Sequence, residues 1–292
     1  MEKLKIWIDA SRPKTLPAAA APVIMGSAMA FNDRLMHVPS ALAALFAALL
    51  IQIGTNLAND YFDYIKGADT KDRLGPTRAT QAGLVPPSTM KWAFILAFGI
   101  AFLIGLYLIH RGGWPILLIG LSSILFGILY TGGPYPLGYN GLGDIFVLIF
   151  FGPVAVGGTY YVQALDINHV VILAGLAPGL ISTAILTVNN LRDINTDANA
   201  GKRTLVVRFG VGFAKKEYIL SIVAACLLPL LLIYLTSENF YSVLTLFVLI
   251  PSIPGMKTIL ENKHDIALNK VLADTGKMLF IYSIIFSVGW II

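Results

Sequence analysis

The chain has 292 residues, of which 57% are hydrophobic and 13% are charged, and its mean hydropathy is +0.75. Because soluble domains carry about 25% charged residues, these values exclude an ordinary soluble protein and favour an integral membrane protein in a lipid bilayer. The net charge of +5 does not indicate a nucleic-acid partner, since basic residues of membrane proteins gather in cytoplasmic loops.

An amphipathic stretch begins the chain. Residues 1–14 combine four basic side chains with Trp7, which predicts a short helix at the membrane interface. We interpret Arg12 and Lys14 as anchors to the membrane surface, and contact with an anionic substrate is the alternative.

Apolar runs long enough to cross a bilayer follow along the rest of the chain. A membrane-spanning helix needs about 20 apolar residues. The predicted fold class is therefore an all-α polytopic membrane protein of about nine helices, which we treat as one domain over residues 1–292. The predicted spans are 15–32, 38–59, 89–109, 113–131, 142–163, 169–190, 216–236, 240–260 and 274–292.

The basic residues give this topology an orientation. With nine spans and a cytoplasmic N-terminus, 19 of the Lys and Arg residues fall on the cytoplasmic side, and only Arg34 and Arg111 fall outside. Such an asymmetry is typical of the positive-inside rule. We therefore expect a multi-pass protein of the plasma or inner membrane whose N-terminus and polar loops face the cytoplasm.

An acidic stretch follows the second predicted span. It runs from residue 56 to residue 78 and contains four carboxylates and two amides near its start, namely Asp60, Asp63, Asp69, Asp72, Asn56 and Asn59. Acidic side chains at a membrane are costly and usually functional. If the helix continues beyond the apolar run, Asn56, Asp63 and either Asn59 or Asp60 share one face.

A second acidic stretch, residues 189–203, follows the sixth predicted span. Asn189 precedes Asp193 and Asp197 by one and two turns. The Asn-x-x-x-Asp spacing of Asn56 and Asp60 recurs here at an offset of 133 residues, or four spans. This even number of spans hints at a parallel internal duplication.

The two acidic stretches suit magnesium ions and a diphosphate. Neighbouring carboxylates repel each other, and Mg²⁺ is commonly held by one or two carboxylates together with substrate phosphates. The basic residues beside them are candidates for binding phosphate oxygens: Lys66, Arg73, Arg78, Lys202 and Arg203. Solvated loops whose acids pair with neighbouring bases are the alternative.

A glycine-rich segment lies between the fourth and fifth spans. It reads TGGPYPLGYNGLGD from Thr131 and lacks the order of a phosphate-binding loop. We interpret it as a tight cytoplasmic hairpin.

The acidic stretches resemble the motifs of the UbiA superfamily of membrane prenyltransferases, NDxxDxxxD after the second helix and DxxxD after the sixth. The first motif is matched by Asn59, Asp60 and Asp63, with Gly67 at the third Asp position and Asp69 two positions later. Asp193 and Asp197 match the second motif. The resemblance implies nine helices around a central cavity, dependence on Mg²⁺, and a polyprenyl diphosphate donor. It also implies that Asp60, Asp63, Asp193 and Asp197 are catalytic.

Within the superfamily the chain is similar to the menaquinone-pathway branch, which acts on 1,4-dihydroxy-2-naphthoate. This similarity rests on RPKTLPAAAAPVIMG from Arg12, NDYFDYIKGADT from Asn59, RATQAG from Arg78 and GLGDIFVLIFFGPVAVGGTYYVQ from Gly141. The branch transfers a polyprenyl group to the naphthoate with loss of CO₂ and diphosphate, giving demethylmenaquinol.

Two alternatives remain open from the sequence. The acceptor is another aromatic quinone precursor, such as 4-hydroxybenzoate, or the protein is a membrane transporter or lipid flippase that uses its acids to couple ions. The clustering of the acids at one face of the membrane, rather than at its midplane, argues against transport. No segment of the sequence indicates an obligatory protein partner.

Overall fold

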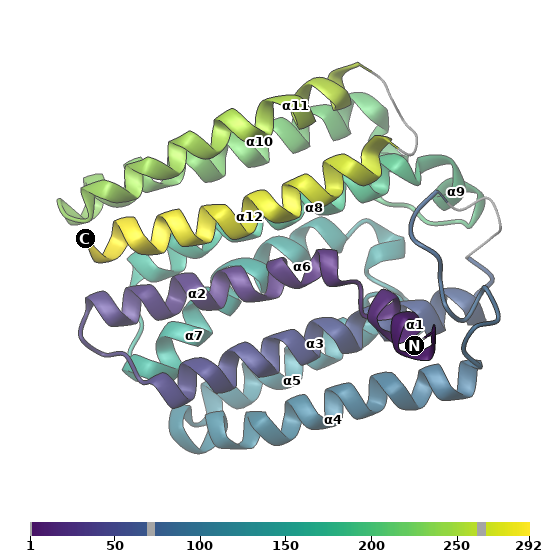
Figure 1. The fold of residues 1–292 in the computed structure, drawn as a ribbon, viewed down its shortest axis with the longest axis horizontal. Helices are drawn as coiled ribbons and strands as arrows, with labels where there is room; N and C mark the ends of the chain where they lie inside the picture. The colour runs from purple at the N-terminus through teal and green to yellow at the C-terminus, as the bar shows by residue number, and fades with distance from the viewer. Residues whose placement is uncertain (1, 69–73, 262–266) are drawn as a thin grey trace.

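The computed structural model describes residues 2–68, 74–261 and 267–292, and all regular structure within these ranges is helical. Figure 1 shows long helices side by side with their axes roughly aligned. The predicted all-α polytopic fold class is confirmed. Connections that carry the two acidic stretches lie at the same end of the bundle, close to the short N-terminal helix α1 (Glu2–Ser11).

Seven helical segments of the described chain are long and apolar enough to cross a membrane. They are α3 (Val38–Ile65), α4 (Pro87–Gly112), α6 to α7 (Gly143–Ala164), α8 (His169–Arg192), α10 (Leu205–Thr236), η4 to α11 (Phe240–Leu260) and α12 (Ala267–Ile291). The other two predicted spans correspond to shorter helices, α2 (Leu16–Asn32) of 17 residues and α5 (Trp114–Leu129) of 16.

Two helices extend beyond their predicted spans at the end of the bundle that carries the acids. Helix α3 continues to Ile65, so Asp60 and Asp63 lie within it, and α10 begins at Leu205 with a kink at Gly210, where φ is 79°. Hydropathy misses the end of α3 because its side chains are polar, and it misses the start of α10 because Arg208, Lys215 and Lys216 interrupt the apolar run. The expected sharing of a helix by the first acids is therefore confirmed.

The span from Gly143 to Ala164 is broken in its middle. Helix α6 (Gly143–Ile149) passes into a π-helical turn, η3 (Phe150–Val154), and then into α7 (Ala155–Ala164). Pro153 cannot donate the usual backbone hydrogen bond, and Gly152 has non-helical dihedral angles (φ −114°, ψ −113°). The break lets the backbone of η3 lie directly against α8.

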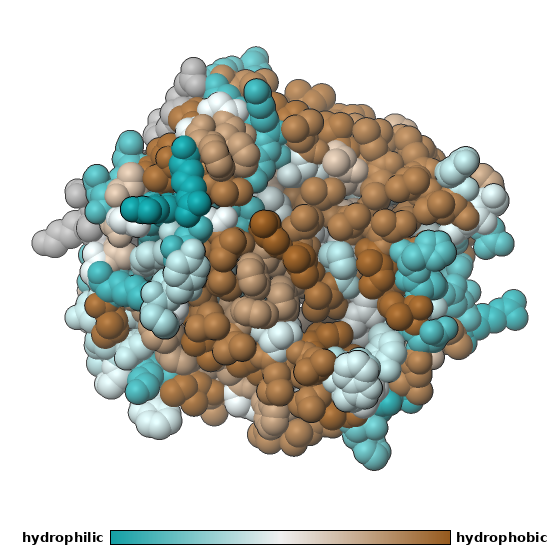
Figure 2. All heavy atoms as spheres, turned by 180° about the vertical axis from the view of Figure 1, so that it is seen from behind, coloured by the Kyte–Doolittle hydropathy of each residue, from teal (hydrophilic) through white to brown (hydrophobic). Residues whose placement is uncertain are grey.

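The outer surface of the bundle is apolar. Figure 2 shows a broad hydrophobic band between two more hydrophilic margins. On α4, for example, Trp92, Leu96 and Leu103 are each at least 64% exposed. Soluble proteins rarely expose apolar patches of this extent, so the band indicates the surface that contacts lipid. The chain is thus a membrane-embedded protein with several spans.

We predict that position 179 of α8 tolerates only glycine, because it contacts the backbone of the broken helix. A Cβ on Gly179 would collide with the carbonyl oxygen of Leu148 and lie 3.1 Å from Cα of Gly152. We expect Gly179→Ala to lower the free energy of unfolding by about 1–3 kcal/mol. Gly99→Ala is the control, since no atom lies within 4 Å of a Cβ there and alanine favours helix by about 1 kcal/mol. Thermal unfolding in detergent measures both, and equal effects would contradict the close contact.

Candidate active site

A polar cavity of about 190 Å³ lies at the end of the bundle where the two acidic stretches meet. Both stretches contribute side chains to its wall: Asn59, Asp63, Asn189, Asp193 and Asp197. Residues separated by more than 120 positions in the sequence therefore face one cavity.

A single lysine links the carboxylates of the two stretches. The Lys202 Nζ lies 3.4 Å from Oδ1 of Asp197 and 3.7 Å from Oδ1 of Asp63. Its side chain is only 14% exposed, so the two attractions act in a partly desolvated place. Lys202 thus offsets the mutual repulsion of two acids that the fold brings together.

Tyr139 joins this group from the glycine-rich segment between α5 and α6. Its hydroxyl donates a 2.7 Å hydrogen bond to Oδ1 of Asp63, and the Nζ atoms of Lys66 and Lys202 each lie 4.9 Å from its ring centroid. These distances are those of cation–π contacts. The segment is therefore part of the site wall, which the interpretation as a hairpin did not include.

The first acidic stretch holds a buried arginine in place through two different carboxylates. Arg78 donates through Nη2 to Oδ2 of Asp63 at 2.7 Å, and both side chains are at most 6% exposed. The carboxylate of Asp60 accepts the backbone N–H groups of Ala79 (2.9 Å) and Thr80 (3.1 Å). Asp60 therefore fixes the backbone that presents Arg78, and it does not line the polar cavity.

Arg192 holds the second acidic stretch. Its Nε and Nη2 donate to the two carboxylate oxygens of Asp193 at 2.8 and 2.5 Å, and Nη2 also donates to Oδ1 of Asn189. Its Nη1 donates to Oδ1 of Asn269 on α12, whose amide donates to the carbonyl of Leu74. This bidentate pairing fixes the carboxylate plane and connects it to the loop after α3.

The two asparagines of the first stretch have different surroundings. Asn59 lines the polar cavity, and its Oδ1 accepts a 2.8 Å hydrogen bond from the hydroxyl of Thr131. Asn56 instead donates to the carbonyl of Ser11 (2.9 Å) and the hydroxyl of Thr15 (3.0 Å). Asn56 thereby ties α3 to the segment between α1 and α2.

The predicted phosphate-binding residues divide into two groups. Arg78 and Lys202 line the polar cavity. Lys66 does not, and its Nζ donates to the carbonyls of Thr131 and Gly133, while Arg203 has an exposed side chain and donates its backbone N–H to Tyr139. Two of the predicted residues, Asp69 and Arg73, lie outside the described part of the chain, as does Asp72.

The cavity wall also includes residues outside the predicted site set. Arg12 lines the polar cavity, which favours contact with an anionic substrate over membrane anchoring. Tyr130 and Tyr139 also line it; the first directly precedes the glycine-rich segment and the second lies within it. A tyrosine beside a glycine-rich turn is the only signal that points to them in the sequence, and it is too common to identify a site.

The acids of the cavity favour a bound cation. Burial raises the pKa of Asp197, Lys202 lowers it, and the nearby carboxylates of Asp193 and Asp63 raise it again. Within the described residues, no three His, Cys, Asp or Glu side chains converge closely enough to enclose a metal alone. Carboxylate and amide oxygens that leave other positions to water and phosphate are nevertheless the donor set that Mg²⁺ takes. The residues present therefore fit this ion together with a phosphate ligand.

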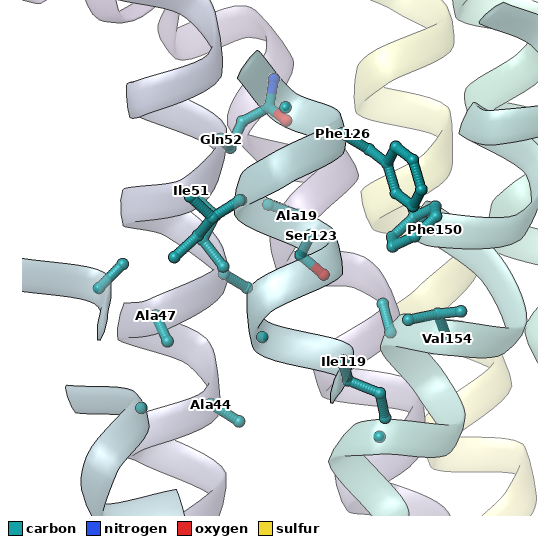
Figure 3. A pocket seen from close by; sticks show the side chains of 18 of the residues that line it. Ala19, Ala44, Ala47, Ile51, Gln52, Ile119, Ser123, Phe126, Phe150 and Val154 are labelled. Atoms are coloured by element: carbon teal, nitrogen blue, oxygen red, sulfur yellow. The ribbon is translucent and has the colours of Figure 1, made fainter. Parts of the chain in front are cut away.

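An apolar chamber of about 320 Å³ adjoins the polar cavity. Gln52, Asn59 and Tyr130 line both spaces, so the two cavities lie side by side and share part of their wall. Figure 3 shows the chamber between α3, α5 and the segment from η3 to α7, with Ile51, Ser123 and Val154 among the side chains that line it. This shape suits a molecule with an anionic head and a long apolar tail.

We predict that Arg192 stabilises the fold through its pairing with Asp193. In Arg192→Ala the buried carboxylate would lose its partner, so we expect the free energy of unfolding to fall by about 3–5 kcal/mol. Lys270→Ala is the control, because it removes an ion pair with Asp274 whose lysine is 82% exposed, and such pairs contribute at most about 1 kcal/mol. Denaturant unfolding in detergent compares the two variants, and similar losses would argue against the buried clamp.

Comparison with known proteins assigns this architecture to a family. The model of the UbiA prenyltransferase family matches residues 19–284. The 1,4-dihydroxy-2-naphthoate octaprenyltransferase of Haemophilus influenzae is 38% identical over all of this chain and 97% of its own length. The enzyme of the same name from Escherichia coli is 38% identical over 99% of this chain and 96% of its own length.

Solved structures agree with this assignment at the level of the fold. A UbiA homologue from Archaeoglobus fulgidus bound to GPP and Mg²⁺ superimposes with a TM-score of 0.71 at 12% identity, covering 98% of this chain and all of that one. A digeranylgeranylglyceryl phosphate synthase gives 0.62 at 20% identity, over 100% of this chain and 99% of the other. With a helical bundle that joins two acidic stretches at one cavity, and with these relatives, the chain belongs to the UbiA prenyltransferase family.

Proposed function

We propose that this protein transfers a polyprenyl group from a polyprenyl diphosphate to 1,4-dihydroxy-2-naphthoate, with loss of CO₂ and diphosphate, to give demethylmenaquinol. The observation that carries the proposal is the adjacency of the acidic cavity and the apolar chamber, which share lining residues. The head of the donor fits the first space and its tail fits the second. Relatives named for this reaction cover nearly the whole chain and support the choice of acceptor.

The proposed metal ligands are Asp63, Asp193 and Asp197, with Asn59 and Asn189 beside them. When bound, Mg²⁺ neutralises the diphosphate and makes it a better leaving group. We assign Asp60 and Asn56 to positioning, since their polar atoms hold backbone and side-chain groups outside the polar cavity.

The basic residues of the cavity assist departure of the diphosphate. Lys202, Arg78 and Arg12 line the same wall as the acids and supply donors for phosphate oxygens. Because they are held in place before the reaction, they stabilise the developing negative charge without reorganisation. Tyr139 holds Asp63 through its hydroxyl and Lys202 through its ring, so it fixes the relative positions of these two side chains.

The reaction balances without an external oxidant or base. The allylic C–O bond breaks, and both electrons leave with the diphosphate. The ring carbon that carries the carboxylate forms the new C–C bond, and the carboxylate leaves as CO₂ while its electron pair restores the aromatic ring. The apolar walls formed by Phe126, Phe150 and Val154 keep water from the allylic cation.

We predict Mg²⁺-dependent prenyl transfer in liposomes that contain the purified protein. With a polyprenyl diphosphate and 1,4-dihydroxy-2-naphthoate, we expect release of pyrophosphate and CO₂ in equal amounts, measured by a coupled assay and by label in the carboxylate. Turnover of 4-hydroxybenzoate alone would keep the mechanism and change the acceptor. No turnover of either acceptor by folded protein would refute the proposal and favour the transport alternative.

Variants of the same assay separate ligands from positioning residues. Asp63→Ala, Asp193→Ala and Asp197→Ala should each lower turnover by on the order of 10²- to 10³-fold. Asp60→Asn keeps one acceptor oxygen for the backbone amides, so it should retain more activity than Asp63→Asn. Asp166→Ala is the control, because Asp166 is exposed and lies at the opposite end of the bundle. Full activity in two of the three alanine variants would exclude the proposed ligand set.

We also propose that the site faces the cytoplasm and that the chain acts as one domain. The excess of basic residues at the end of the bundle that carries the acids supports this orientation. The internal duplication inferred from the repeated Asn-x-x-x-Asp spacing stays a prediction.

A cysteine-labelling experiment tests the orientation. Ser88 and Glu238 are exposed and lie near opposite ends of the bundle, while the native Cys226 is buried. We expect an impermeant maleimide added to intact cells to label Glu238→Cys and to spare Ser88→Cys until the membrane is opened. The unaltered chain controls for labelling of Cys226, and the reverse pattern would invert the proposed topology.

A further inference from the structure

Two glycines line the apolar chamber without any packing reason to be glycine. Gly105 on α4 and Gly120 on α5 both face it, and a Cβ built on either residue meets no atom within 4 Å. Neither has a positive φ, so the backbone does not require glycine. Glycine also weakens a helix by about 1 kcal/mol relative to alanine. What these positions provide is open space.

Two other glycines, Gly54 on α3 and Gly127 on α5, have an ordinary structural explanation. A Cβ on Gly54 would lie 2.8 Å from the ring of Phe98, and one on Gly127 would lie 2.6 Å from the hydroxyl of Thr55. These residues allow α3, α4 and α5 to approach one another. Gly105 and Gly120 therefore differ from their neighbours, because a side chain at either position would enter the chamber and not an adjacent helix.

The two glycines lie at one depth in the chamber. Helices α4 and α5 form a hairpin whose turn is at Gly113, eight residues after Gly105 and seven before Gly120. Tyr130, which borders the polar cavity, is ten residues beyond Gly120, and a helix rises 1.5 Å per residue. The glycines are therefore roughly 15 Å from the polar end.

The chamber continues past the glycines toward the turn between α4 and α5. Ala47, Leu108, Ile116 and Val162 line it, pack into one apolar cluster and are each at most 7% exposed. On α3 the chamber is lined by the small side chains of Ala44 and Ala47, which Figure 3 labels. A tail that stays in the chamber and extends beyond roughly 15 Å therefore reaches the level of Gly105 and Gly120.

We propose that Gly105 and Gly120 determine which donors the enzyme accepts, by leaving room for the distal part of a long prenyl tail. This inference rests on the proposed function and adds the residues that set its selectivity for chain length. A larger side chain at either position shortens the chamber, and the polar cavity stays unchanged.

The test compares donors of different length on two variants. Gly105→Leu and Gly120→Leu are assayed with dimethylallyl, geranyl and a long polyprenyl diphosphate, each with the naphthoate acceptor. We expect kcat/KM for the long donor, relative to that for the dimethylallyl donor, to fall by roughly 10- to 200-fold, the range for misfit in an apolar pocket. Product lengths from a mixture of donors, measured by mass spectrometry, should shift toward the short ones.

Gly99→Leu is the matched control on α4. Gly99 also has no atom within 4 Å of a built Cβ, but it is exposed and does not line the chamber. It should keep the donor profile of the unaltered protein. An unchanged profile in both chamber variants, with folding verified by thermal unfolding, would show that long tails leave by another route and would overturn the inference. Absence of turnover with every donor in the unaltered protein would instead count against the proposed function.

Discussion

The desolvation of carboxylates at the end of a membrane bundle is the constraint on which this structure depends. Asp63, Asp193 and Asp197 are each at most 8% exposed, and an unpaired buried charge would cost several kcal/mol. The fold compensates each with a specific cation: Arg78 for Asp63, Arg192 for Asp193 and Lys202 for Asp197. Because these cations come from different segments, charge neutralisation also fixes how α3, α8 and the loops that follow them meet. The ion pairs therefore determine the arrangement of the segments that form the polar cavity.

The same end of the bundle separates groups that bind ligands from groups that support them. Asp60 and Asp63 are one turn apart on α3, yet Asp60 accepts two backbone amides while Asp63 faces the cavity. By holding the backbone of residues 79 and 80, Asp60 places Arg78 where it can pair with Asp63. Asp60 therefore affects the cavity only through Arg78 and Asp63. Asn269 has a comparable place in the other half, because it connects Arg192 to the carbonyl of Leu74. Both halves are therefore linked through the loop after α3.

Hydropathy and the spacing of charged residues predicted the helical membrane fold and the two acidic stretches, because both patterns can be read along a single chain, while the central cavity was implied by the family resemblance. They could not predict Tyr139, whose part in the site depends on a hydroxyl that reaches a carboxylate 76 positions away. They also did not distinguish Arg192 from the other basic residues, since its neighbours in the sequence do not show whether an arginine is buried in an ion pair or exposed to solvent. Helical spacing placed Asp60 and Asp63 on the same helix, but the different partners of each depend on residues 78–80 and on the glycine-rich segment.

The polar cavity and the apolar chamber recognise different parts of the donor. Charge in the polar cavity can recognise any allylic diphosphate, since the head group is the same for every tail length. Discrimination between tails must therefore come from the apolar chamber, where dispersion and exclusion depend on volume. A side chain that enters the chamber removes volume that a long tail would occupy, while a short tail keeps its contacts nearer the polar cavity. Side-chain volume at Gly105 and Gly120 is consequently the simplest variable by which this fold could change its product without altering its chemistry.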